Sequence, residues 1–145
     1  MATADVGFEL DLPASAAWEL IADFGSPARI APGFVRECVL EGDERIVTFE
    51  SGATVRQKLI TSDAARRRLV YSVIGGSFDH HNAAMEVLAL GCSRSAIRWI
   101  ADMAPEEIQP LIQAMMEEGA HAIVAEQKRR AIAAGAMPQK RWFAD

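Results

Sequence analysis

The sequence contains few of the residue types that most often mark a site. Its 145 residues include two cysteines, three histidines and one tyrosine. Cys38 and Cys92 lack the close spacing of metal ligands and are too few for a disulfide framework. We therefore expect reduced thiols and a cytoplasmic protein. His80 and His81 are adjacent, but neighbouring residues of a strand point to opposite faces, so the two cannot easily bind one ion together. The sequence therefore predicts no metal site. We also expect no cofactor.

Long apolar runs and an excess of positive charge are also missing. No stretch approaches the ~18–20 apolar residues of a membrane span, so we expect none, and we expect no signal peptide. The net charge of −5 argues against nucleic acid as a partner. The 50% of hydrophobic residues and 24% of charged residues are typical of a globular chain. We expect one ligand-binding domain over residues 1–135 and a C-terminal tail over residues 136–145.

The hydrophobic pattern changes period along the chain. Residues 6–12 alternate like a strand, residues 14–24 have helical spacing, and residues 25–33 are rich in turn formers with at most a short helix. The alternation then predicts six strands, at residues 34–42, 45–52, 54–63, 66–76, 80–91 and 94–103. One long helix is predicted from about residue 110 to 134, followed by Gly135. This order predicts an α+β fold, a seven-stranded antiparallel sheet covered by the C-terminal helix.

Polar side chains fall on faces that should point inward. Alternation places Arg36, Gln57, Tyr71 and His81 among apolar neighbours. Four such residues are too many for a dry core, and an apolar face with a few polar groups is typical of a ligand cavity. A glycine inside a helix, such as Gly119, destabilises it by about 1 kcal/mol relative to alanine. Two explanations are open: a ligand approaches the helix closely at this position, or a bulky neighbour such as Trp99 packs there.

Three strings carry a family resemblance: "LPASAAWELIADFGSPARIAPG", "SGATVRQKLITSDAARRRLVYSV" and "WIADMAPEEI". In this order they resemble the SRPBCC superfamily, with its Bet v 1-like helix-grip fold, and within it the bacterial polyketide cyclase/dehydrase-like (START-like) proteins. A fainter likeness to plant abscisic-acid receptors is carried by "GFVREC", "ESGATV" and "VIGGSFDHHNAAMEV". The resemblance implies a curved sheet wrapped around the long helix, with one small, largely apolar ligand between them.

The resemblance also implies roles for individual residues. Arg36 matches a basic residue that meets a ligand carboxylate, and the loops Ser51–Thr54 and Gly75–His80 match loops that close over the cavity mouth. Gln57 stands where an acidic residue is usual, which removes an obvious general base. The matching wall positions are Phe49, Gln57, Tyr71, Val73, His81, Ala83 and Met115.

Two chemical interpretations of these residues stay open. His81, supported by Tyr71 on the preceding strand through a cross-strand hydrogen bond, is a candidate catalytic acid or base, and equally a candidate wall residue. Arg36 is either an anion clamp or a strand-end arginine that reaches water or pairs with Glu37 or Asp43. The candidate ligand-binding residues are Arg36, Phe34, Phe49, Gln57, Val73, Ala83, Met85, Trp99, Met115 and Gly119.

The expected function has two forms. The chain binds one hydrophobic, aromatic or polyketide-like molecule that carries a carboxylate or phenolate, with cofactor-free acid–base chemistry of the cyclase, dehydratase or lyase type. Alternatively, it carries or senses a small lipid, quinone or aromatic molecule without converting it. Trp142 and Phe143 in the tail are candidates for packing on their own domain or on a second chain, as in a homodimer.

Overall fold

The computed structural model describes residues 1–135, so the expected packing of Trp142 and Phe143 lies outside the described residues. The chain alternates once between strand and helix, forms six further strands in succession, and then enters one long helix. The elements are β1 (Ala2–Leu10), α1 (Ala14–Ala22), α2 (Pro27–Ile30), β2 (Val35–Glu41), β3 (Glu44–Phe49), β4 (Thr54–Asp63), β5 (Arg68–Ile74), β6 (His80–Ala89), β7 (Ser95–Ala104), the 3₁₀ turn η1 (Glu106–Ile108) and α3 (Gln109–Ala133).

The seven strands form one antiparallel sheet in the order β1-β7-β6-β5-β4-β3-β2. Strands β2 to β7 follow one another as a meander, and β1 pairs with β7, so β1 and β2 are the edges. The predicted α+β fold and antiparallel sheet are confirmed. The first strand begins earlier than expected, because its pairing with β7 extends to Ala2 opposite Met103. Helix α1 ends earlier, because Asp23 is extended and its carboxylate accepts the Gly25 N–H at 3.1 Å.

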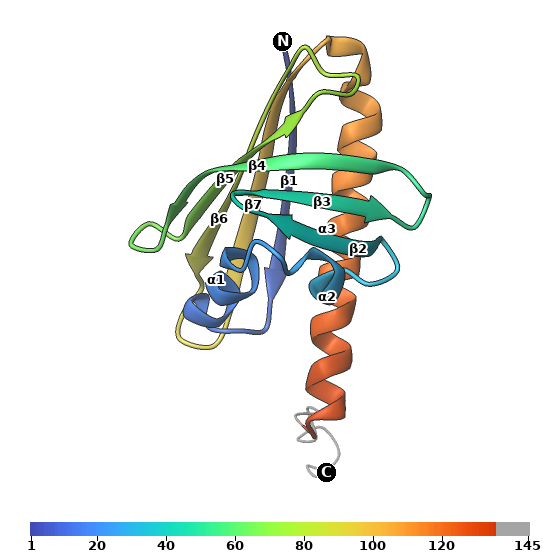
Figure 1. The fold of residues 1–145 in the computed structure, drawn as a ribbon. Helices are drawn as coiled ribbons and strands as arrows, with labels where there is room; N and C mark the ends of the chain where they lie inside the picture. The colour runs from blue at the N-terminus through green and yellow to red at the C-terminus, as the bar shows by residue number, and fades with distance from the viewer. Residues whose placement is uncertain (136–145) are drawn as a thin grey trace.

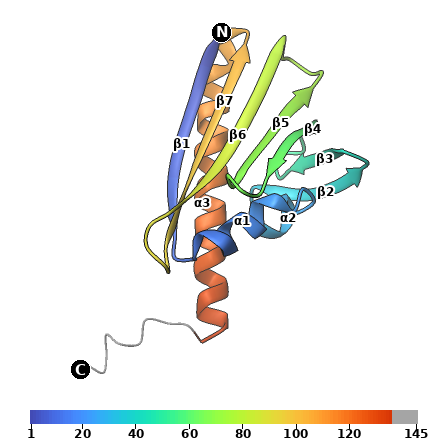
Figure 2. The same ribbon diagram turned by 90° about the vertical axis from the view of Figure 1, so that its left-hand side faces the viewer.

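Helix α3 lies along one side of the curved sheet. Figure 1 shows α3 running alongside β1 and β7, while β2, β3 and β4 cross it at a steep angle. Figure 2 shows α1 and α2 near the lower part of the helix, and α2 contacts α3 directly. Pro110 lies in the first turn of α3, where no intrahelical N–H is lost. Within residues 1–135, no helix is long and apolar enough to cross a membrane.

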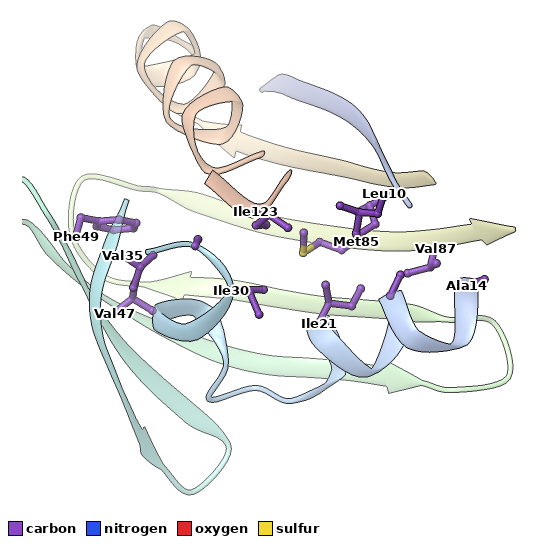
Figure 3. Close-up of a cluster of buried hydrophobic side chains, with 13 residues drawn as sticks. Leu10, Ala14, Ile21, Ile30, Val35, Val47, Phe49, Met85, Val87 and Ile123 are labelled. Carbon is purple, nitrogen blue, oxygen red and sulfur yellow. The ribbon is translucent and has the colours of Figure 1, made fainter. Parts of the chain in front are cut away.

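The buried apolar side chains form two clusters between the sheet and the helices. In the first cluster Leu10 of β1, Ile21 of α1, Ile30 of α2, Val47 of β3 and Ile123 of α3 converge (Figure 3). The second cluster joins the other end of α3 to the middle of the sheet, through Leu69, Tyr71, Ala101, Met103 and Met116. Members of both clusters line the same cavity, so the core holds the cavity wall in place.

Candidate ligand-binding site

A cavity of about 430 Å³ lies between the sheet and α3. Its wall is mostly apolar, built from α1, α2, the inner face of the sheet and one face of α3. The loops after β3 and β5 contribute Ala53, Gly76, Ser77 and Phe78 to the lining. Gly75 and Gly76 both have positive φ, 74° and 70°, a conformation that glycine adopts without strain. The tight turn between β5 and β6 at this part of the cavity therefore depends on the Gly-Gly pair.

The structure brings most of the predicted site residues together around this cavity. Ten of the twelve candidates contribute to its lining: Phe34, Phe49, Gln57, Tyr71, Val73, His81, Met85, Trp99, Met115 and Gly119. They come from β3, β4, β5, β6, β7, α3 and the segment before β2. The structure thus places them at one site, while their roles in binding or catalysis stay predictions.

Arg36 does not join this group, so its expected inner-face position is wrong. A β-bulge shifts the β2–β3 register between Val35, opposite Phe49, and Glu37, opposite Thr48. The extra residue resets the alternation, so Val35 is buried and the Arg36 side chain is 54% exposed. Its guanidinium lies 3.6 Å from the Glu50 carboxylate and donates to the Glu50 carbonyl at 2.8 Å. Arg36 is therefore an exposed arginine that reaches water, as in the alternative interpretation of the sequence, but its partner is Glu50 and not Glu37 or Asp43.

Ala83 also lies outside the cavity lining. It is 1% exposed and packs in the second core cluster, directly opposite Tyr71 on β5 and Ala101 on β7. The inward direction of its side chain agrees with the alternation.

A row of polar side chains crosses the sheet at one level. Arg45 of β3 is the register partner of Gln57 of β4, and Gln57 is the partner of Val73 of β5. The Val73 N–H in turn donates to Nδ1 of His81 on β6 at 3.0 Å. Arg45, Gln57 and His81 are each less than 10% exposed, at 7%, 8% and 8%. The sheet therefore holds one cation, one amide and one imidazole in line along the cavity wall.

Arg45 is the charged member of this row. Its Nε donates to Gln57 Oε1 at 2.7 Å, and its Nη1 donates to the Phe24 carbonyl at 3.1 Å. The guanidinium carbon lies 4.0 Å from the centre of the Phe24 ring and 5.0 Å from the centre of the Tyr71 ring. Burial lowers the pKa of Arg45 below its usual value, and nearby aromatic faces partly offset the lost hydration of the cation.

His81 is held as a neutral hydrogen-bond donor. Because Nδ1 accepts the Val73 N–H, the ring proton must be on Nε2. Burial, followed by the nearby His80, lowers the pKa of His81 to about 4. The Phe78 ring packs edge-on against the imidazole, with the ring centres 4.8 Å apart. At neutral pH the side chain offers an N–H to its surroundings and no free lone pair.

Tyr71 and His81 do not form the expected hydrogen bond. Tyr71 is opposite Ala83 in the register, so its hydroxyl lies away from the imidazole and instead accepts the Trp99 Nε1–H at 3.1 Å. The two rings are tilted neighbours, with centres 6.0 Å apart. Burial raises the pKa of the Tyr71 phenol above its usual 10, so the side chain stays neutral at physiological pH.

Gly119 allows α3 to approach two aromatic side chains. A Cβ built on it would lie 3.0 Å from Cε2 of Phe34 and 3.3 Å from Cζ3 of Trp99. The glycine therefore accommodates bulky neighbours, and it also contributes to the cavity lining. The explanation by bulky neighbours is confirmed, and the close approach of a ligand stays a prediction.

Arg45 was not among the residues singled out from the sequence. The signal was present, because strict alternation places Arg45 on the face of β3 that carries Val47 and Phe49. Its position as the first of these three, directly after a turn, makes it resemble a solvated strand-end residue. Only the register with Gln57 shows that the arginine is enclosed.

Solved structures of other proteins share this fold. The chain is 19% identical to an uncharacterized protein from Bacillus thuringiensis, with a TM-score of 0.78 over 86% of this chain and 97% of that one. The di-domain ARO/CYC protein BexL of the BE-7585A biosynthetic pathway is 14% identical, with a TM-score of 0.76 over 88% of this chain and 47% of that one. Norcoclaurine synthase from Thalictrum flavum, in complex with dopamine and hydroxybenzaldehyde, is 19% identical, with a TM-score of 0.69 over 86% of this chain and 84% of that one.

The comparison with family models covers almost the entire sequence. The sequence has no significant match among the curated proteins. Residues 1–134 match the model described as polyketide cyclase / dehydrase and lipid transport. The helix-grip arrangement of sheet and α3 agrees with the structural neighbours of this group. The chain therefore belongs to the polyketide cyclase/dehydrase and lipid transport family, within the SRPBCC superfamily.

Proposed function

We propose that the chain binds one small, largely apolar molecule between the sheet and α3, and carries or senses it without converting it. The observation that carries this proposal is a cavity of about 430 Å³ with apolar walls, a few polar side chains and no free base among them. This volume lies within the range of roughly 300–1,000 Å³ typical of small-molecule sites. The family match, and a protein of similar fold solved in complex with dopamine and hydroxybenzaldehyde, support the binding of a small molecule.

The chemistry of the polar side chains favours binding over acid–base catalysis. A general base needs an available lone pair with a pKa near the working pH. The Nδ1 lone pair of His81 already accepts a backbone N–H, and the pKa of about 4 keeps the ring neutral. Gln57 cannot ionise, and the cavity lining within residues 1–135 contains no Asp or Glu. His81 and Tyr71 therefore serve in this proposal to orient the ligand, and their catalytic roles become the alternative to be tested.

Binding is tested with the neutral fluorescent compound N-phenyl-1-naphthylamine. The wild-type chain should bind one equivalent, and Gly119→Leu should weaken binding at least about tenfold, because the new side chain projects toward Phe34, Trp99 and the cavity. Ala114→Leu, at an exposed position of the same helix, is the matched control and should leave binding unchanged. Val55→Phe narrows the cavity from the sheet side and replaces Gly119→Leu if that variant does not fold. Equal binding by all variants contradicts the proposal.

Turnover is tested separately from binding. Native mass spectrometry of the purified protein identifies the molecule that it retains, and that molecule is then incubated with fresh protein. Recovery of the unchanged molecule supports carriage or sensing. Conversion that is lost in His81→Gln, with binding retained, contradicts carriage and supports the acid–base enzyme.

A further inference from the structure

Arg45 is a buried cation with no acidic partner in the described part of the chain. The guanidinium donates to one side-chain oxygen, Gln57 Oε1, and to one backbone oxygen, the Phe24 carbonyl, and both acceptors are neutral. The ionisable groups that act on it are Tyr71 and Cys38, and burial raises the pKa of both, so both are neutral at pH 7. A guanidinium enclosed without a counter-ion is unfavourable, because the lost hydration is not replaced by an opposite charge. A negative charge brought into the cavity would supply that missing partner.

Gln57, Tyr71 and His81 are left with hydrogen-bond donors for an occupant. A guanidinium only donates, so the oxygen of the Gln57 amide faces Arg45 and its NH₂ group is left to donate. The Tyr71 oxygen accepts from Trp99, which leaves the Tyr71 O–H as a donor. His81 accepts from Val73 and is left with Nε2–H. Ser26, which also lines the cavity, donates its only O–H to the Leu20 carbonyl at 2.8 Å, so its oxygen is left as an acceptor. The row therefore offers several donors and one positive charge to an occupant.

We propose that the natural ligand is an apolar organic acid, whose oxyanion binds Arg45 and the Gln57 amide while its apolar body fills the space toward α3. This inference rests on the proposed function and names the ligand class of the same site. Arg45 has three N–H groups beyond the two that are hydrogen-bonded to Gln57 and Phe24. A carboxylate matches such a fork because its two oxygens accept parallel hydrogen bonds. Tyr71 and His81 lie further along the wall and suit a second oxygen of the ligand, such as a carbonyl.

Gln57 keeps this site selective for an anion. A glutamate at the same position would lie within hydrogen-bond distance of Arg45, as the Gln57 oxygen does at 2.7 Å, and would neutralise it. The amide holds the guanidinium in place without cancelling its charge. The variant Gln57→Glu therefore tests the proposal. It replaces the amide by a carboxylate, so the protein itself supplies the counter-ion of Arg45.

The test compares acids with neutral amides of the same shape by isothermal titration calorimetry at pH 7. The pairs are 2-naphthoate with 2-naphthamide, and dodecanoate with dodecanamide. The wild-type chain should bind the acid of at least one pair about tenfold or more tighter than its amide. Arg45→Met and Gln57→Glu should each reduce this preference below about threefold. Arg36→Met removes the exposed arginine of the neighbouring strand and is the matched control, with the preference retained.

The outcomes separate this inference from the proposed function. Equal binding of acid and amide by the wild type overturns the anion site and leaves ligand binding intact. Loss of the preference in Arg36→Met but not in Arg45→Met also overturns it. Failure of both pairs to bind contradicts the proposed function together with this inference. If circular dichroism shows that Arg45→Met is unfolded, Gln57→Glu decides the result, because it preserves the side-chain volume.

Discussion

At the residue scale, the hydrogen-bond partners decide what each polar side chain of the cavity can do. His81 has an ordinary position on the inner face of β6, but the Val73 N–H fixes its tautomer and burial disfavours its protonated form. The Tyr71 hydroxyl is fixed in a similar way by Trp99. Side chains that look like an acid–base pair in the sequence therefore become hydrogen-bond donors in the folded chain.

The low pKa of His81 predicts a pH dependence of stability. The unfolded chain takes up a proton on this histidine near pH 6.5, whereas the folded chain does so only near pH 4. The stability that His81 contributes is thus fully present above pH 6.5 and is lost as the pH falls to about 4. We expect a loss of about 1–2 kcal/mol over this window, less than the full pKa difference because the ring borders the open cavity.

Urea unfolding between pH 4 and pH 7 measures this contribution. His81→Gln keeps an acceptor for the Val73 N–H but does not titrate, so its stability should vary less with pH than that of the wild type. His80→Gln, at the exposed neighbouring position, should keep most of the wild-type slope. Identical slopes in the wild type and His81→Gln would show that His81 is protonated equally in both states.

Single-residue positions also mark the limit of prediction from the sequence. Alternation correctly places Gln57, Tyr71 and His81 on the inner face. Gln57 pairs with Val73, Tyr71 with Ala83 and His81 with Met103, and the register shift in β4 falls after Leu59. It fails at Arg36, where the bulge in β2 inserts a residue that no local pattern announces. The enclosure of Arg45 follows from its pairing with Gln57 of β4, a contact between strands that local sequence does not reveal.

At the element scale, α3 closes one edge of the sheet with side chains in place of a further strand. The Gln113 amide accepts the Asp5 N–H at 3.0 Å and donates to the Asp5 carbonyl at 3.0 Å, which satisfies an edge residue of β1 on both sides. Gln109 donates to the Thr3 carbonyl at 3.1 Å. An edge strand with unpaired backbone groups is a site for unwanted pairing, and these glutamines cover it.

Replacing Gln113 should loosen this edge without unfolding the domain. Gln113→Ala removes both hydrogen bonds to Asp5, which are exposed, so we expect a loss of about 1 kcal/mol in unfolding free energy. Hydrogen exchange of the Asp5 amide should become clearly faster, while the amides of β5 and β6 stay protected. Glu118→Ala on an exposed position of the same helix is the control. Unchanged exchange at Asp5 would show that β1 is held by β7 alone.

The elements themselves were predicted well from the sequence. Period-two alternation located all six strands of the meander, and Pro110 and Gly135 bounded the long helix, because these signals are local. Local sequence does not show which element lies beside an edge strand of the sheet. That β1 pairs with β7 and that α3 packs along β1 follow from how the sheet curves around the helix.

At the scale of the whole molecule, an acidic protein is proposed to bind an acidic ligand. The net charge of −5 repels an approaching anion, while one enclosed guanidinium attracts it. These two effects differ in range. The repulsion acts through water and is screened by salt over about 8–10 Å at physiological ionic strength, whereas the contact with Arg45 lies inside the protein and is screened much less.

Salt therefore distinguishes the enclosed site from binding on surface arginines. Between about 0.05 and 0.5 M NaCl, we expect the ratio of the 2-naphthoate and 2-naphthamide dissociation constants to change by less than about threefold. Salt screens the contact with the buried Arg45 only weakly, and its screening of the repulsion between the acidic protein and the acid slightly favours binding of the acid. The neutral amide corrects for the effect of salt on apolar binding. Arg36, Arg56 and Arg98 are surface cations already paired with carboxylates, and an anion that bound there would lose most of its advantage in high salt. A fall in the acid preference of about tenfold or more would place the anion on the surface and remove Arg45 from recognition.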